Sequence, residues 1–525
     1  MKNRKTSPAL QTHPNPPYRE RVISFFRLSL SLTLSLSLTL SLSLTLSLLL
    51  MACSSTPTDV TVKNQLPAIY PDYIGVTIPD GIAPMNFNIR SNDEVEVVDV
   101  VVKGSKGGEL HTNDAWARFD VDEWHALTTA NKGGELTFTV CVKQGGNWTQ
   151  YKDFKMYVSK YDLEEWGLTY RRIAPGYEVF SHMGIYQRDL ANFEETAIID
   201  NTQLLGQCIN CHMTNRTNPD RMVFHIRGDH GATLMQMDGQ RDVLAAKNDL
   251  LGGSMVYPYW HPSGDYCAFS TNQTRQGFHE IRNERIEVFD LSSDIFVYNP
   301  KTREILEDSL ISTKEWSENS PVFSPDGKTI YYMTCKQVED PNDYKNEKYN
   351  LCRIAFDPAT GKYGNKVDTL FNAVKMGKSL TWPRPSYDGK WMLFTLIDYG
   401  YFSIWHRESD QWLMNLQTGE SRPFTEINSD NTDSYHNWNV NSHWIVFTSR
   451  RGDGLHTRLY LASIDENGKG TKPFLLPQEN PWEYYDESLY SFNTPDFSSK
   501  KVEFDSHAAA REIMSDKRNK TKVRQ

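Results

Sequence analysis

Hydrophobic and polar residues alternate along much of this chain, and this period of two predicts β-strands. The clearest alternation spans residues 135–142, where the hydrophobic positions are Leu136, Phe138, Val140 and Val142. A "QGGN" turn follows, and a second alternating run starts at Phe154. Two such runs joined by a glycine turn are typical of a hairpin with one buried face. We therefore expect residues 53–160 to form a small antiparallel β-sandwich module with no catalytic residue.

Four segments in the second half of the chain follow one template. They read "YPYWHPSGDYCAFSTN" from Tyr257, "SPVFSPDGKTIYYMTC" from Ser320, "WPRPSYDGKWMLFTLI" from Trp382 and "YHNWNVNSHWIVFTSR" from Tyr435. The turn residues Gly264, Gly327, Gly389 and Ser442 are 63, 62 and 53 residues apart, and five positions later the copies carry Phe269, Tyr332, Phe394 and Phe447. A strand, a tight turn and further strands make a small sheet that needs neighbours to bury both faces. The template therefore predicts the blades of a β-propeller.

Two further segments, from Arg221 and from Asn493, match the template more weakly and bring the count to five or six blades. The phrase "FSPDG" at residues 323–327 and its copies resemble TolB-type propellers, the Pro-Asp-rich relatives of WD-repeat proteins. The resemblance covers residues 220–510 and implies a closed ring with binding surfaces on its loops. The expected fold is mainly β: a sandwich module, a connector at residues 161–219, a five- or six-bladed TolB-like propeller and a basic tail at residues 511–525.

The first 52 residues are interpreted as an export signal. A basic stretch precedes an uncharged, Leu-rich run of low complexity, which fits a signal segment or a membrane anchor. The run ends in Leu50-Met51-Ala52-Cys53, which resembles the bacterial lipobox and implies lipidation of Cys53. Since Ser54 and not Asp follows, the resemblance implies the outer membrane, without deciding which face. The alternative is an uncleaved anchor with an incidental cysteine.

Residues 208–212, "CINCH", have the C-x-x-C-H spacing that attaches a c-type haem. Two thiols three residues apart can reach the two vinyl groups on one edge of a porphyrin, and the next imidazole can bind the iron. The motif predicts thioether bonds at Cys208 and Cys211 and a proximal iron ligand at His212. Zinc would need a fourth ligand, and a thioredoxin-like pair would need a βαβ setting that is not seen. A structural role for the motif stays open.

The distal haem ligand is not fixed by the sequence. His230, in the turn "RGDHG", is the preferred candidate because a turn can present an imidazole to a neighbouring plane. The other candidates are His182, Met222, His225, Met235 and Met237. The choice between histidine and methionine would set the reduction potential.

The remaining cysteines fit an oxidising compartment. Cys335 ends one strand of its blade and Cys352 begins the strand that returns beside it, so a disulfide between them is expected. Cys141 and Cys267 are interpreted as ordinary buried thiols.

Charge and composition narrow the function classes. The formal charge is −10, and removing residues 1–52, which carry five net positive charges, leaves −15. So acidic a surface repels phosphate backbones, which argues against a nucleic-acid partner. The chain has no G-x-S-x-G elbow, P-loop, H-E-x-x-H or G-x-G-x-x-G motif.

The sequence therefore predicts an outer-membrane lipoprotein with covalent haem c that works in electron transfer or redox-linked interaction with an envelope partner. One alternative is a non-catalytic propeller scaffold that binds envelope proteins or glycans, with a link to cytochrome c biogenesis. A second alternative is a propeller hydrolase. No enzymatic activity is favoured, and the oligomeric state stays open.

Overall fold

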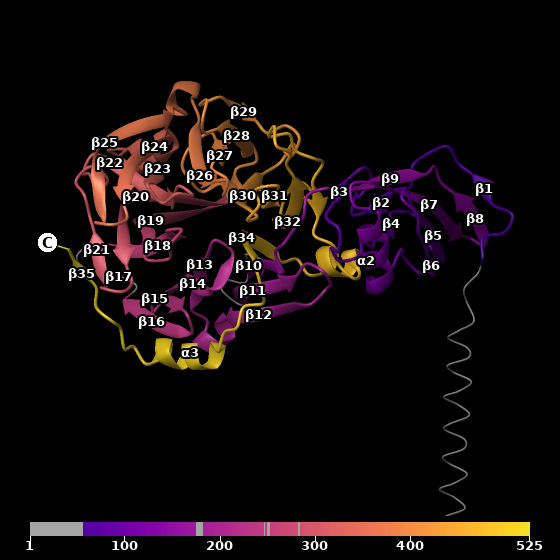
Figure 1. Cartoon of the computed structure of the whole chain (residues 1–525), viewed down its shortest axis with the longest axis horizontal. Coiled ribbons are helices and arrows are strands. Elements are labelled where there is room, and N and C mark those ends of the chain that lie inside the picture. Colours follow the sequence, from indigo (N-terminus) through magenta and orange to yellow (C-terminus); the bar gives the residue numbers. More distant parts are fainter. Residues whose placement is uncertain (1–55, 175–181, 246, 249–252, 282–283, 525) are drawn as a thin grey trace, which may run out of the picture. The chain divides into compact units, whose positions relative to one another are not determined.

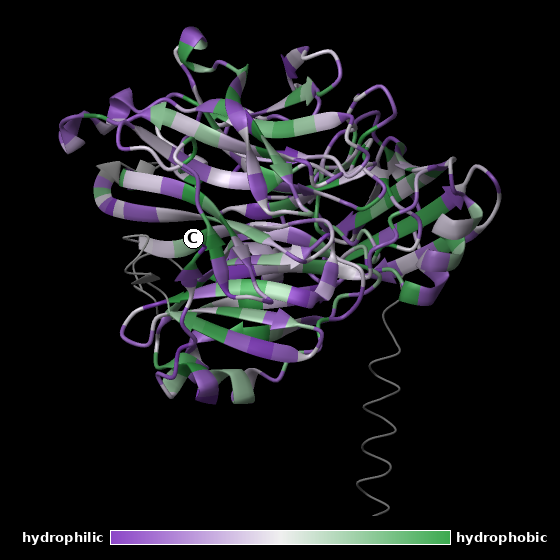
Figure 2. Cartoon of the chain, turned by 60° about the vertical axis from the view of Figure 1, so that its left-hand side comes forward, coloured by the Kyte–Doolittle hydropathy of each residue, from purple (hydrophilic) through white to green (hydrophobic). Residues whose placement is uncertain are grey.

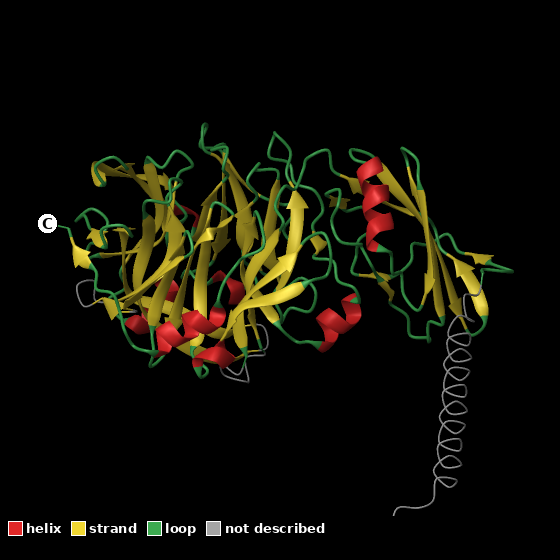
Figure 3. Cartoon of the chain, turned by 60° about the horizontal axis from the view of Figure 1, so that its bottom comes forward, coloured by secondary structure: helices red, strands yellow, loops and turns green. Residues whose placement is uncertain are grey.

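The computed structural model describes residues 56–174, 182–245, 247–248, 253–281 and 284–524 (Figure 1). The predicted signal segment and its lipidation site, Cys53, lie outside these residues. Strands are the main regular structure of the described chain and helices are short (Figure 3). None of the helices in the described part is long and apolar enough to span a membrane.

The N-terminal module contains a seven-stranded mixed sheet and a helix. Its strands are β1 (Thr61–Val62), β3 (Thr77–Ile78), β5 (Val97–Gly104), β6 (Glu109–Asp114), β7 (Glu135–Gln144), β8 (Asn147–Gln150) and β9 (Phe154–Val158). A separate pair is formed by β2 (Ile69–Tyr70) and β4 (Asn88–Ile89). The predicted pairing is confirmed, because Phe138 of β7 lies opposite Phe154 of β9.

The prediction of a purely antiparallel sandwich is wrong for this module. β1 pairs with β8 and β3 pairs with β9 in parallel. Helix α2 (Val121–Ala130) takes part in the core through Trp124, Leu127 and Thr128, which are buried. The Asp120 side chain caps this helix by accepting from the backbone N–H groups of the first turn.

The rest of the chain forms six sheets, which we number as blades 1 to 6 (Figure 1). Blade 1 contains β10 (Gly167–Ile173), β11 (Met183–Asp189), β12 (Glu195–Asp200) and β34 (Ser491–Ser498), and blade 2 contains β13 (Cys208–Asn215), β14 (Asn218–Arg227), β15 (Ala232–Met237) and β16 (Gln240–Ala245). Blade 3 contains β17 (Lys247–Asn248), β18 (Gly253–Trp260), β19 (Cys267–Ile281), β20 (Glu284–Asn299), β21 (Glu304–Leu306) and β35 (Lys522–Val523). Blade 4 contains β22 (Trp316–Phe323), β23 (Thr329–Lys336), β24 (Asn350–Asp357) and β25 (Lys362–Phe371). Blade 5 contains β26 (Ser379–Pro385), β27 (Trp391–Ile397), β28 (Asp410–Asn415) and β29 (Ser421–Pro423), and blade 6 contains β30 (Asp433–Trp438), β31 (Trp444–Ser449), β32 (Arg458–Ser463) and β33 (Phe474–Leu475).

The six sheets close into a ring, as a propeller requires. The inner strands β34, β13, β18, β22, β26 and β30 each lie next to the following one, and β30 lies next to β34. The ring is closed within blade 1, where the late strand β34 pairs with the early strand β10, with Leu168 opposite Phe497. A closed ring leaves no blade with an unpartnered face. Hydrophobic and hydrophilic residues alternate along many of its strands (Figure 2).

Two predicted boundaries are wrong. Residues 161–219 contain β10, β11, β12 and β13, so they are part of the propeller and not a connector. The basic tail is folded as well: helix α3 (Ser506–Met514) buries Ala509 and Ile513, and β35 pairs with β21. Short helices complete the described elements: η1 (Asn201–Leu204), η2 (Pro341–Asn346), η3 (Val374–Met376), η4 (Ser403–Trp405) and η5 (Glu483–Glu487).

Candidate functional site

The C-x-x-C-H motif lies on β13, the inner strand of blade 2. Asn210 pairs with His225 of β14 and Met213 pairs with Val223, so Cys211 and His212 together face the single residue Phe224. This is a β-bulge, and Cys211 adopts a φ of 53° there.

The same bulge recurs on every inner strand, opposite an aromatic residue of the second strand. The first bulge residue is Thr494, Cys211, Tyr257, Ser320, Trp382 or Tyr435 in blades 1 to 6, and the facing residue is Tyr170, Phe224, Phe269, Tyr332, Phe394 or Phe447. The second bulge residue is a proline in four blades and a histidine in blades 2 and 6. Proline is tolerated at a bulge because its missing N–H removes no hydrogen bond between the strands there. Cys211-His212 is therefore the blade 2 copy of a structural element that all six blades share.

His212 has the surroundings of its counterpart in blade 6, His436. The side chains of both are buried, and burial lowers the pKa of His212 to about 4 and that of His436 to about 3. Each imidazole lies against the backbone of the preceding blade, at Thr169 for His212 and at Trp382 and Leu393 for His436. His212 thus packs between blades 1 and 2.

The described geometry does not fit a covalent haem at this motif. Attachment needs both sulfur atoms and the imidazole on one open side of the chain, as successive turns of a helix would place them. On β13 the chain is extended, His212 is 5% exposed, and Cys208 is buried and accepts a hydrogen bond from Arg171 Nη2 at 3.4 Å. No group of three or more His, Cys, Asp or Glu residues in the described part is arranged to hold a metal ion. Haem attachment stays a prediction that this fold does not support.

The predicted distal ligands have other contacts. His230 Nδ1 lies 2.9 Å from Asp516 Oδ1, and His225 Nδ1 lies 2.9 Å from Thr233 Oγ1. His182 lies 3.4 Å from the Tyr490 hydroxyl. The methionine candidates are core residues: Met222 and Met235 are fully buried on opposite faces of blade 2, and Met237 packs beside Met235 at the edge of the core.

The expected disulfide between Cys335 and Cys352 is not formed, and both are free, buried thiols. Cys352 lies opposite Tyr332, three residues before Cys335 on β23. Three strand residues span about 10 Å, and a disulfide needs Cα atoms within about 7 Å. Cys141 and Cys267 are free and buried, as predicted.

A group of polar side chains near the centre of the ring has the features of a binding site. We name Arg171, Cys208, Cys211, Arg227 and Tyr257 the inner-ring cluster. Arg227 is exposed, and Arg171, Cys211 and Tyr257 are partly exposed, so solvent reaches the cluster. Burial raises the pKa of the Cys211 thiol, and the guanidinium groups of Arg227 and Arg171 oppose this rise.

The two arginines of the cluster have unusual partners. Arg171 Nη2 donates to Met183 Sδ at 3.3 Å and to Cys208 Sγ at 3.4 Å, and sulfur is a weak acceptor. Although the Arg227 side chain is exposed, the protein atoms around it partly desolvate the guanidinium group and act to lower its pKa. The Cys211 thiol and the Tyr257 and Tyr401 phenols outweigh this effect and raise that pKa. Neither arginine lies within 4 Å of a carboxylate among the described residues, whereas the adjacent Arg172 pairs with Glu195.

Aromatic rings adjoin the cluster, three of them from the bulge positions. The ring of Tyr257 lies 6.4 Å from that of Trp382 and 6.0 Å from that of Tyr401, and Trp382 lies 4.4 Å from Tyr435. The sequence repeat marks Tyr257, Trp382 and Tyr435 as template positions. Nothing in the sequence singles out Arg171 and Arg227, because they follow no motif.

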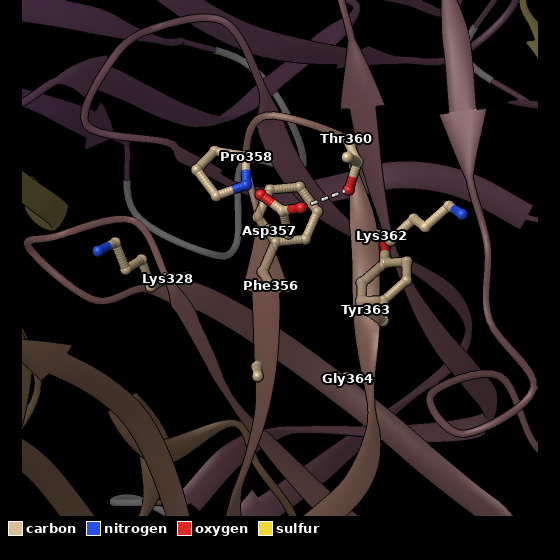
Figure 4. A pocket seen from close by; sticks show the side chains of 9 residues that line it. Lys328, Phe356, Asp357, Pro358, Thr360, Lys362, Tyr363 and Gly364 are labelled. Carbon is tan, nitrogen blue, oxygen red and sulfur yellow. Dashed lines mark hydrogen bonds between the residues drawn. The ribbon is translucent and has the colours of Figure 1, made fainter.

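A separate pocket lies on blade 4 (Figure 4). It is lined by the end of β24, the start of β25 and Lys328, and Thr360 donates to Asp357 at 2.6 Å across its turn. This hydrogen bond lowers the pKa of Asp357. No cysteine, histidine or arginine lines this pocket, so it lacks the groups of the inner-ring cluster.

No protein-family model and no curated protein matches the chain. Solved β-propeller structures do match it. TolB from Acinetobacter baumannii is 13% identical with a TM-score of 0.41, and the match covers 73% of this chain and 86% of TolB. A puromycin-hydrolyzing peptidase from Mycobacterium tuberculosis is 12% identical with a TM-score of 0.34, over 77% of this chain and 57% of the peptidase. The periplasmic gluconolactonase PpgL from Pseudomonas aeruginosa is 11% identical with a TM-score of 0.33, over 63% of this chain and 99% of that enzyme.

These similarities concern the fold. The chain is mainly β and is a propeller distantly similar to those of TolB and the prolyl oligopeptidases.

Proposed function

We propose that this protein is a non-catalytic binding protein of the bacterial cell envelope, in which the inner-ring cluster binds a small anionic ligand. The observation that carries the proposal is the pair Arg171 and Arg227, which face thiols and no carboxylate among the described residues. A guanidinium group has five donors in a planar fork that matches carboxylate and phosphate groups. A ligand with such a group would supply the acceptors that sulfur supplies poorly.

The net charge strengthens the argument. In a chain of net charge −10, a site with two arginines that have no carboxylate partner among the described residues is a local exception. The field at such a site favours anions even when the protein as a whole repels them. Export through residues 1–52 and a lipid anchor at Cys53 belong to the same proposal and place the protein at a membrane.

Binding of anions tests the proposal directly. Isothermal titration calorimetry would compare acetate, citrate and inorganic phosphate on the wild type and on Arg171→Gln and Arg227→Gln. We expect at least one of these anions to bind, and each variant to weaken its binding tenfold or more. The matched control is Arg353→Gln, which removes a half-exposed arginine that pairs with Asp368 on blade 4 and should leave binding unchanged. An absence of binding, or equal affinities of wild type and Arg227→Gln, would overturn the proposal.

A second measurement tests the predicted electron-transfer function separately from anion binding. The protein would be produced together with a c-type cytochrome maturation system and analysed by haem staining and intact mass. Because β13 does not present the motif on one open side, we expect no stain and a mass equal to that of the lipidated polypeptide. A stained band with the mass of one added haem would restore the redox function and require β13 to rearrange.

The hydrolase alternative gains no support from the described residues. His261 Nδ1 lies 2.8 Å from Ser263 Oγ, but the two residues form part of a turn in which the Ser263 backbone N–H also donates to that nitrogen. A nucleophilic serine needs an imidazole that is free to take its proton.

A further inference from the structure

Two buried carboxylates lie on the blade 3 and blade 4 side of the inner-ring cluster. Asp290 of β20 is 5% exposed, and Glu347, which precedes β24, is 2% exposed. Neither has a lysine, arginine or histidine within 4 Å among the described residues. Asp290 Oδ2 accepts from Asn272 Nδ2 at 2.6 Å and from Asn319 Nδ2 at 2.9 Å, and both donors are neutral amides. Asp290 Oδ1 and Glu347 Oε2 are buried and have no hydrogen-bond partner of normal geometry in the described part of the chain.

The pKa values agree with this lack of a cation. Burial raises the pKa of Asp290 to about 7, although the amides of Asn272 and Asn319 oppose the rise. Burial also raises the pKa of Glu347 to about 8, and the charges of Asp290 and Glu287 add to it. A positive group placed beside them would reverse these effects.

Two tyrosines connect the carboxylates to the arginines. The charge of Asp290 acts on the Tyr401 phenol and raises its pKa beyond the rise caused by burial. The ring of Tyr401 lies 6.0 Å from the ring of Tyr257 in a perpendicular arrangement. Burial raises the pKa of Tyr257, Asp290 raises it further, and Arg227 lowers it. Tyr257 is thus close enough to Asp290 and to Arg227 for the charge of each to shift its pKa.

The two halves form no ion pair with each other among the described residues. Tyr257 and Tyr401 each lie close enough to Arg227 and to Asp290 to interact with both electrostatically. Aromatic rings also attract cations through their faces. An anion would satisfy Arg171 and Arg227 and leave Asp290 and Glu347 without a partner. A ligand with a carboxylate and an ammonium group would satisfy both halves.

We propose that the ligand is zwitterionic, an amino acid or a short peptide, whose carboxylate contacts Arg171 and Arg227 and whose ammonium group lies toward Asp290 and Glu347 across Tyr257 and Tyr401. This inference rests on the proposed anion-binding function and names its ligand class.

The test compares matched probes that differ only in charge. Calorimetry on the full chain would measure each of the twenty L-amino acids and the dipeptide L-alanyl-L-alanine. The tightest binder would then be compared with its N-acetyl form, which keeps only the carboxylate, and its amide, which keeps only the ammonium group. We expect the zwitterion to bind at least tenfold more tightly than the N-acetyl form, and the amide to bind most weakly.

Variants separate the inference from the proposed function. Asp290→Asn and Glu347→Gln should each reduce the preference for the zwitterion to less than threefold and leave binding of the N-acetyl form unchanged, while Arg227→Gln should weaken both probes. Glu318→Gln, which removes a buried carboxyl that accepts from Thr313 Oγ1 at 2.9 Å, is the control and should change neither. Equal binding of the zwitterion and the N-acetyl form, with Arg227→Gln still weakening both, would overturn the ligand class alone. Probes that bind equally to wild type and Arg227→Gln would overturn the proposed function as well.

Discussion

Replacing Asp290 with asparagine should stabilise the protein at neutral and alkaline pH. The Asp290 carboxyl is 5% exposed, and burial raises its pKa from an ordinary 3.8 to about 7. Such a group binds its proton more tightly in the folded chain than in the unfolded chain. The free energy of unfolding therefore falls as the pH rises from about 3.8 to about 7. The full penalty, above pH 7, is roughly 4 kcal/mol, because one pKa unit corresponds to about 1.4 kcal/mol.

The local geometry allows the substitution. The amides of Asn272 and Asn319 both donate to Oδ2, and Oδ1 has no partner of normal geometry among the described residues. An asparagine can place its carbonyl oxygen at the Oδ2 position and keep both hydrogen bonds. Its amino group then takes the Oδ1 position, so that no donor faces another donor.

Urea unfolding followed by tryptophan fluorescence at pH 5, 6, 7 and 8 measures the effect. The stability gain of Asp290→Asn over wild type should grow by about 2 to 3 kcal/mol between pH 5 and pH 8, since most of the titration falls in that window. A gain that is independent of pH would show that neighbouring groups compensate the charge of the Asp290 carboxylate in the fold. A loss of stability at pH 8 would refute the reasoning outright.

Three further predictions concern other parts of the ring. The His406 imidazole faces Glu287 at 3.8 Å, Glu408 at 2.9 Å and the ring of Tyr399; burial opposes its proton, but the two carboxylates prevail and raise its pKa to about 9. The stabilisation that protonated His406 provides is complete below pH 6.5 and is lost as the pH rises through 9. Wild type should therefore lose up to about 3 kcal/mol of its free energy of unfolding over this range in urea titrations, and His406→Gln should not show this loss. Phe497→Ala on β34 should cost about 3 to 5 kcal/mol in the same assay because its side chain is fully buried, whereas Trp316→Ala, at a residue that is 40% exposed, should change little; equal effects would contradict closure of the ring by β34. Iodoacetamide added to the unreduced, denatured protein should label both Cys335 and Cys352 in a peptide mass map, and protection of both would show that the disulfide exists after all.

The repeated blades could be predicted because their chemistry is local. Gly264, Gly327 and Gly389 mark three turns at a fixed offset in the template. The aromatic residues Phe269, Tyr332 and Phe394 lie where the structure has the residue opposite the bulge. Blade 1 could not be predicted in the same way. Its strands "GLTYRRI" and "MGIYQRD" carry no such turn, and its inner strand comes from the other end of the chain. Long-range pairing of this kind leaves no local pattern.

The C-x-x-C-H motif shows that one short pattern can fit two different structural roles. Its spacing meets the requirement for haem attachment, but the same five residues also meet the requirement for a bulged inner strand. The segment "SYHNWN" held the clue, because it places His436 at the position where other copies have a proline. Helix α2 was missed for a different reason: Trp124, Leu127 and Thr128 have helical spacing, but the run is too short to stand out against the strands around it.

The groups of the proposed binding site were beyond sequence reasoning because each is ordinary by itself. Arg171 and Arg227 come from β10 and β14, and Asp290 comes from β20. What distinguishes them is that they have no oppositely charged partner among the described residues, and this is visible only in the folded chain.

The closure of blade 1 by β34 also governs the order of events during synthesis. A chain that emerges from its N-terminus presents β10, β11 and β12 more than 280 residues before the strand that completes their sheet. Until that strand arrives, the edge of β10 is open to pairing with any other extended polypeptide nearby. A chaperone that occupies this edge would therefore have to dissociate last, once the C-terminal segment has emerged from the ribosome.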